Sequence, residues 1–137
     1  MANNYTEFSI ILPPQPGLEE FLENHEQHIA AMEEDERLEY GIGYEAEVVE
    51  EGLWIKDADG WSNLEGASYL IQRYLQQYRD APEAVILEFA SYCDKPRPGE
   101  FYGGARLITK DKDIAFDPYA MALAMAQKEG WTVYIPE

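Results

Sequence analysis

The segment that most constrains the fold is residues 84–92, which is nearly continuous in apolar residues. A run of this length and composition is typical of a central strand, whose two faces are both covered. A loop with two prolines and a glycine, Lys-Pro-Arg-Pro-Gly, follows it at residues 95–99. We therefore place residues 84–92 in the middle of a sheet and expect the other elements to be arranged around it.

Local patterns predict the remaining elements. Strands are expected at residues 5–12, 43–49, 53–55, 101–109, 114–116 and 131–135, where β-branched, aromatic or alternating residues fall between turn signals. Helices are expected from residue 18 to just past 35, at 63–79, and from 118 to 129 between an Asp117 cap and Gly130. The pattern predicts a single α+β domain over residues 1–137, with a mainly antiparallel sheet packed against two to three helices.

The first expected helix combines a narrow apolar stripe with many acids. Its apolar stripe consists of Leu18, Phe21, Leu22, His25, Ile29 and Met32. Glutamates occupy its other faces, and several are like-charged neighbours three or four positions apart, each costing ~0.2–0.5 kcal/mol. Glu33, Glu34 and Asp35 are expected at the C-terminal end, where the helix dipole disfavours negative charge.

The charge of the chain restricts its partners. The formal net charge is -17, from 27 acidic and 10 basic residues, and residues 1–60 carry most of this excess. Nucleic acids and anionic membranes are polyanions, so neither is expected to bind directly. The acidic residues have two readings of equal weight: a solvated surface, or a surface that binds a basic partner.

We take the partner-binding reading forward with a defined set of residues. The candidate residues are Glu19, Glu20, Glu23, Glu26, Glu33, Glu34, Asp35, Glu36, Glu45, Glu47, Glu50 and Glu51. Residues 19–39 alone would carry less than half the charge density of a DNA duplex of the same length. Imitation of DNA would therefore need the strand glutamates as well, or a second copy of the chain. Tyr5, Tyr40, Tyr44, Trp54 and Trp61 are nearby candidates for aromatic anchors.

No catalytic or metal-binding pattern stands out. His25 and His28 are three residues apart rather than the four of the metalloprotease motif, and His25 lies on the apolar stripe, so a partly buried histidine is expected. Asp57–Gly60 fits a turn better than a calcium loop. Cys93 is expected to pack rather than react. We therefore expect no enzyme activity, no catalytic residue, no metal and no cofactor.

A segment of the second half resembles a known group of proteins. The stretches Leu53-Trp54-Ile55, Gln72-Arg73-Tyr74-Leu75, Cys93-Asp94-Lys95-Pro96-Arg97-Pro98-Gly99-Glu100-Phe101 and Gly103-Gly104-Ala105 carry the resemblance. They are similar to small uncharacterised proteins of bacteriophage and bacterial genomes, which implies a phage origin. The acidic first half is similar by analogy to phage counter-defence inhibitors. This resemblance implies an anti-CRISPR or anti-restriction inhibitor that occupies a basic nucleic-acid-binding surface of a host nuclease or CRISPR effector.

Two alternatives remain open. One is a small enzyme or ligand-binding protein, whose pocket residues would be Tyr74, Tyr92, Arg97, Arg106 and Tyr119. The other is a homodimer in which the acidic half of one copy meets basic residues of another, namely Lys95, Arg97, Arg106, Lys110 and Lys112. A lone cysteine, no signal peptide and no apolar stretch of membrane-spanning length lead us to expect a cytoplasmic protein, in the host cell if phage-encoded.

Overall fold

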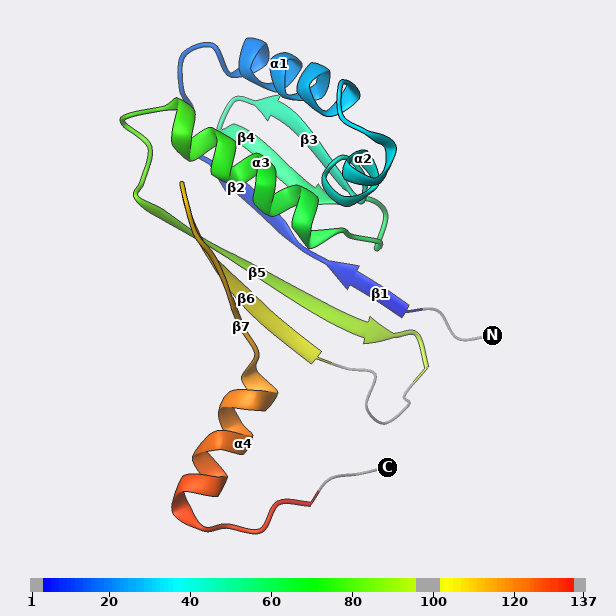
Figure 1. Cartoon of the computed structure of the whole chain (residues 1–137), viewed down its shortest axis with the longest axis vertical. Coiled ribbons are helices and arrows are strands. Elements are labelled where there is room, and N and C mark those ends of the chain that lie inside the picture. Colours follow the sequence, from blue (N-terminus) through cyan, green and yellow to red (C-terminus); the bar gives the residue numbers. More distant parts are fainter. Residues whose placement is uncertain (1–3, 96–101, 135–137) are drawn as a thin grey trace.

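The computed structural model describes residues 4–95 and 102–134, and every structural statement below refers to them. Eleven elements follow one another along these residues (Figure 1). Their order is β1 (Asn4–Glu7), β2 (Ser9–Leu12), α1 (Leu18–Ala30), α2 (Glu34–Tyr40), β3 (Tyr44–Val49), β4 (Gly52–Asp57), α3 (Leu64–Gln77), β5 (Ala84–Cys93), β6 (Tyr102–Thr109), β7 (Asp113–Phe116) and α4 (Pro118–Glu129). The mixed α+β class predicted from the sequence is confirmed.

The strands form two antiparallel sheets. Sheet A has the strand order β1-β5-β6-β7, and sheet B has the order β2-β4-β3. The predicted central position of residues 84–92 is confirmed, because β5 lies between β1 and β6. Only one face of β5 is fully buried, however, since Val85 and Leu87 alternate with the exposed Ile86 and Glu88.

The predicted strand 5–12 is divided between the two sheets at Phe8. Residues 4–7 pair with β5 of sheet A, and residues 9–12 pair with β4 of sheet B. The Phe8 side chain is 5% exposed, and its backbone N–H donates to Asp57 Oδ1 at 3.0 Å. The other oxygen of Asp57 accepts from the Gly60 N–H at 2.6 Å, within the predicted turn. Asp57 therefore fixes both the crossing point of the strand and the turn after β4.

Helix α3 joins the two sheets through one hydrophobic core. Its apolar side chains Ala67, Leu70, Ile71, Tyr74 and Leu75 are buried. They contact the inward faces of β3, β5 and β6, and Phe21 of α1 packs edge-on against Tyr74. The N-cap of α3 is Asn63, whose side chain accepts from the Glu65 N–H. Burial of this shared stripe is the main force that holds sheets A and B together.

The prediction of one long first helix is wrong. Helix α1 ends at Ala30, and α2 begins at Glu34 after an extended residue, Glu33. The apolar stripe explains the break: Ile29 and Met32 are half-buried, whereas no residue of α2 is fully buried and only Tyr40 is half-buried. A continued α1 would have carried this mostly charged segment past the core, whereas in α2 the Tyr40 ring packs on Tyr69 of α3.

The predicted third helix is confirmed, but the strand expected after it is not. Asp117 Oδ1 accepts from the backbone N–H groups of Tyr119 and Ala120, and Gly130 ends α4 with a φ of 76°. Residues 131–134 form no strand, and Ile135 lies outside the described residues. Because α4 points away from both sheets, residues 131–134 meet no edge of a described strand with which to pair (Figure 1).

Candidate partner-binding surface

The predicted acidic residues gather at one end of the molecule. They lie on α1, on α2 and the residue before it, on β3, and in the turn between β3 and β4, and all twelve are exposed. These elements form the end of the molecule opposite α4 (Figure 1). We call this set the acidic surface; its members are Glu19, Glu20, Glu23, Glu26, Glu33, Glu34, Asp35, Glu36, Glu45, Glu47, Glu50 and Glu51.

The carboxylates of the acidic surface are almost all unpaired. Of its twelve carboxylates, only that of Glu45 forms an ion pair with a described residue: Lys56 Nζ lies 3.9 Å from its Oε2. Both side chains are well exposed, so this pair adds little stability. The basic side chains of residues 4–95 and 102–134 therefore leave the negative field at this end of the molecule largely unneutralised.

The structure contradicts one argument for a functional role of these acids. Glu33, Glu34 and Asp35 were expected at the C-terminal end of a helix, where their charge would be unfavourable. Glu33 is instead the N-cap residue of α2, and Glu34 and Asp35 lie in its first turn, where the helix dipole favours negative charge. Their charges therefore have a structural reason and do not by themselves indicate a partner-binding role.

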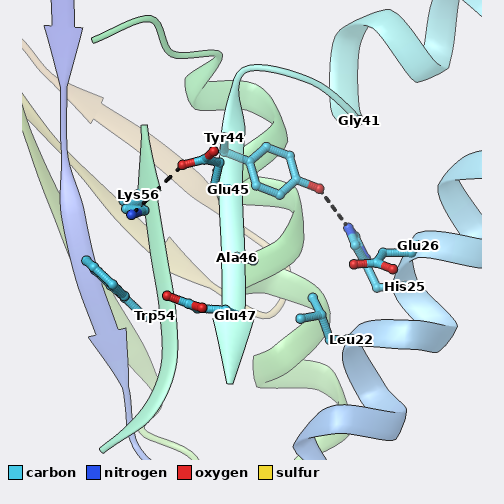
Figure 2. A pocket seen from close by; sticks show the side chains of 10 residues that line it. All are labelled: Leu22, His25, Glu26, Gly41, Tyr44, Glu45, Ala46, Glu47, Trp54 and Lys56. Atoms are coloured by element: carbon cyan, nitrogen blue, oxygen red, sulfur yellow. Dashed lines mark hydrogen bonds and ion pairs between the residues drawn. The ribbon is translucent and has the colours of Figure 1, made fainter. Parts of the chain in front are cut away.

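The acidic surface contains a groove beside β3, which is an edge strand of sheet B. The groove has a volume of about 530 Å³. Figure 2 shows Tyr44 pointing from β3 toward α1, with Glu45 and Glu47 on the opposite side of the strand. The lining residues are Leu22, His25, Glu26, Gly41, Tyr44, Glu45, Ala46, Glu47, Trp54 and Lys56. Carboxylates from α1 and β3 thus share one hollow with an aromatic ring.

The register of the β3–β4 hairpin places Trp54 and Lys56 among these carboxylates. Glu45 is opposite Lys56 and Glu47 is opposite Trp54. Lys56 Nζ lies 4.2 Å from the centre of the Trp54 ring, and Trp54 Nε1 donates to Ser9 Oγ at 2.8 Å. Lys56 was not a candidate from the sequence, although the alternation along 53–57 puts it on the same face as Trp54.

The five aromatic candidates have different environments. Trp61 is 55% exposed and is free to act as an anchor. Trp54 and Tyr44 are half-buried in the groove, Tyr40 packs on Tyr69 with ring centres 4.8 Å apart, and Tyr5 stacks on Tyr92. Trp54 and Trp61 are therefore the aromatic rings best placed to meet a partner.

His25 is a buried histidine, as predicted. It is 1% exposed, and its Nδ1 accepts from the Arg73 guanidinium at 3.3 Å. Since arginine can only donate, the proton is on Nε2, which donates to Tyr44 Oη at 3.2 Å. Burial, then the Arg73 charge and His28, lower the pKa of His25 to about 4. Burial, then Glu26, raises the pKa of Tyr44 to about 12.

The two histidines do not form a metal site with each other. His28 Nε2 is instead 2.7 Å from Tyr69 Oη, and the two rings stack. Across residues 4–95 and 102–134, no group of three histidine, cysteine, aspartate or glutamate residues could hold a metal ion. Cys93 is 3% exposed at the end of β5, which fits its expected packing role.

The residues of the predicted aromatic and arginine pocket do not come together. Tyr74 is in the core and donates to the Pro13 carbonyl, whereas Tyr92 lies on β5 against Tyr5. Arg106 pairs with Glu65 at 2.7 Å and Asp113 at 3.1 Å beneath α3, and Tyr119 is on α4. Arg97, like the rest of the segment 96–101 that carries much of the phage resemblance, lies outside the described residues.

Comparison with known proteins gives no information on the function of the acidic surface. No family model, curated protein or solved structure matches the chain. In the part of the chain that the structure describes, no helix has the length and apolar character needed to cross a membrane.

Proposed function

We propose that the chain is an acidic protein-binding inhibitor that occupies a basic, nucleic-acid-binding surface of another protein. The observation that carries the proposal is the acidic surface itself: twelve exposed carboxylates at one end, with only Glu45 in an ion pair among the described residues. A protein that binds nucleic acid offers the complementary positive field. The resemblance of residues 53–109 to phage proteins directs the proposal toward host defence complexes, of the CRISPR or restriction type.

The surface supports partial rather than full imitation of a duplex. Two separate helices and one strand carry the carboxylates, so the charges form a patch and not a regular double row. Carboxylates of this kind steer the encounter with a basic channel, whereas desolvated aromatic groups supply most of the affinity. Trp54 in the groove and Trp61 are positioned for that second role.

The first test is capture from a bacterial lysate enriched on heparin for nucleic-acid-binding proteins. The immobilised protein should retain a basic nuclease or CRISPR complex at ~0.1 M salt and release it at ~1 M, because the Debye length falls from ~10 Å to ~3 Å. Free duplex DNA should displace the captured protein, and the inhibitor should in turn lower its nuclease activity. Capture that duplex DNA does not displace would contradict the proposal.

A pair of charge-matched variants makes this test specific. Glu23→Lys with Glu47→Lys reverses two charges within the acidic surface, on α1 and on β3, and leaves the first turn of α2 unchanged. Asp80→Lys with Glu83→Lys reverses two exposed charges outside it, so both proteins have the same net charge. Binding should weaken by roughly 10-fold or more in the first variant and change little in the second. Equal weakening of binding in both variants would mean that only the net charge of the protein matters, and not the position of the carboxylates.

The groove gives the ligand-binding alternative a different location from the one predicted. Its 530 Å³ falls within the ~300–1,000 Å³ typical of small-molecule sites. Native mass spectrometry of the protein purified from bacteria would reveal a retained ligand. Loss of that ligand in a Trp54→Ala variant, with the nuclease unaffected by the parent protein, would favour the alternative over the inhibitor.

A further inference from the structure

Helix α4 is apolar on every side yet packs against almost nothing in its own chain. Residues 118–126 contain no charged side chain, and Tyr119, Met121 and Met125 are each more than half exposed. Ala126 is the one buried residue of the helix. A helix that is hydrophobic all round is normally enclosed by other elements. α4 therefore presents a surface suited to a partner that this chain alone does not provide.

The outward face of sheet A is an apolar sheet face on which none of the four described helices packs. The register aligns Ile86, Leu107 and Ile114 side by side across β5, β6 and β7, and Phe116 is opposite Ala105 in the neighbouring row. Ile86 is 62% exposed. Among the described elements, α3 covers the other face of this sheet, through contacts such as that of Arg106 with Ser68.

The connection between β7 and α4 prevents the helix from covering its own sheet. Asp117 is the single residue between Phe116 and Pro118, and its side chain is committed to capping the helix. Connections of this kind usually need ~2–6 residues. Accordingly, α4 continues away from the sheet, roughly along the direction of β7 (Figure 1).

We propose that the chain forms a two-fold symmetric dimer in which α4 of each copy packs on the outward face of sheet A of the other. Each copy has one helix, α4, that packs on no sheet, and one sheet face that no described helix covers. The contact of α4 with the partner's sheet, repeated by the two-fold symmetry, would cover both apolar surfaces in each copy. This is an isologous arm exchange, and it goes beyond the proposed inhibitor function because it uses the end of the molecule opposite the acidic surface.

The exposed apolar area is large enough for a stable dimer. Most of the large apolar side chains with substantial exposure belong to this region; those from β7 onward are Ile114, Phe116, Tyr119, Met121, Met125, Trp131, Val133 and Tyr134. These eight large side chains, each roughly half exposed, together present an accessible apolar area on the order of 700 Å². A standard interface buries ~800 Å² per partner. Ile86 and Leu107 belong to the sheet face on which the partner's α4 would pack.

The distribution of charge also permits two copies to meet here. Two proteins of net charge -17 repel each other, but residues 1–60 carry most of that charge at the other end of the molecule. Two acidic residues of the described strands project from the outward face of sheet A, Glu88 on β5 and Glu7 on β1, which is opposite Ala90 at the edge of the sheet away from β7. Association through apolar area should therefore persist in high salt, which screens the repulsion.

The test is the mass in solution of the full chain by sedimentation equilibrium. The parent protein should have twice the mass of the 15.7 kDa chain, at ~0.1 M and ~1 M salt alike. Ile86→Glu and Met121→Glu should each raise the dimer dissociation constant by roughly 100-fold, because each buries an unpaired charge. Ile11→Glu is the matched control: Ile11 is exposed on sheet B and should leave the dimer intact.

Disulfide trapping then identifies the contact, in a Cys93→Ser background. A copy with Ile86→Cys mixed with a copy with Met121→Cys should give the mixed disulfide dimer on oxidation. A monomeric parent protein, or a dimer that Ile86→Glu leaves unchanged, would overturn the proposal. Preferential disulfides between two Met121→Cys copies would also overturn it, since helix would then meet helix. A dimer lost at high salt would indicate charge-mediated association instead.

Discussion

At the residue scale, His25 shows how a histidine on an acidic helix can remain uncharged. The surrounding glutamates would favour the protonated ring, but the side chain points inward, away from them, to Tyr44 and Arg73. Desolvation and the Arg73 charge act in the same direction and lower its pKa to about 4. The ring is therefore a neutral link between α1, β3 and α3 at neutral pH.

The lowered pKa of His25 predicts a loss of stability in mild acid. The unfolded chain takes up a proton near pH 6.5 and the folded protein only near pH 4, so the unfolded state binds more protons between these values. The contribution of His25 is complete above pH 6.5 and falls by about 2–3 kcal/mol as the pH drops to 4. Urea unfolding at several pH values measures it.

A His25→Gln variant provides the comparison for this measurement. Glutamine does not titrate, so the difference in unfolding free energy between the parent protein and the variant should shrink as the pH falls from 6.5 to 4. A difference that stays constant over this range would mean that His25 takes up its proton at the same pH in the folded and the unfolded state. Relief of repulsion among the carboxylates affects both proteins alike and cancels in the comparison.

The sequence was sufficient for the positions of most site residues but not for their contacts. The exposure of Glu19 and Glu23 followed from the apolar stripe, because that stripe assigns the other faces of α1 to solvent. The ion pair of Glu45 with Lys56, and the contact of His25 with Arg73, depend on which strands and helices lie side by side. That information is long-range, and local spacing does not contain it.

At the element scale, the β3–β4 hairpin depends on Gly52. Its φ of 140° is in a region that other residues rarely adopt, and an added Cβ would collide with the Leu12 carbonyl oxygen of β2. We expect Gly52→Ala to destabilise the protein by ~3–5 kcal/mol, from backbone strain and the clash together. Thermal and urea unfolding measure this loss.

Gly17 is the matched control for this substitution. It also has a positive φ, 74°, but an added Cβ would meet nothing within 4 Å. Gly17→Ala should therefore cost only ~1–2 kcal/mol, the penalty of the left-handed conformation alone. Equal losses in the two variants would show that the contact with Leu12 has no cost of its own.

Among the elements, those with strong local signals were predictable. The Asp117 cap, Pro118 and Gly130 defined α4, and the alternation along 43–49 defined β3. The break near Met32 was missed, because a helix of acidic residues has no local reason to stop there. The strand expected at 131–135 failed for a tertiary reason: the direction of α4 removes it from any sheet edge.

At the scale of the whole molecule, charge repulsion predicts an unusual response to salt. The net charge of -17 is concentrated in the first 60 residues, so like charges are brought close together on folding. Raising the salt from ~0.01 M to ~0.1 M shortens the Debye length from ~30 Å to ~10 Å, and should stabilise the fold by about 1 kcal/mol. Urea unfolding at fixed pH measures the change.

The double variant Glu23→Lys with Glu47→Lys should show a smaller gain from salt than the parent protein, since part of the repulsion has been removed. A fall in stability with salt would contradict this account. It would mean that screened attractions, such as those of Arg106 with Glu65 and Asp113, outweigh the repulsion.

The crossing of one strand from sheet A to sheet B at Phe8 has a consequence for cooperativity. Residues 4–7 and 9–12 cannot separate from their partners independently, because the buried Phe8 ring and the bond to Asp57 lie between them. Local opening of either sheet would disturb the strand pairing in the other, because residues 4–12 form one continuous stretch of backbone that belongs to both. The two sheets should therefore exchange their amide hydrogens as one unit, with a common free energy of opening.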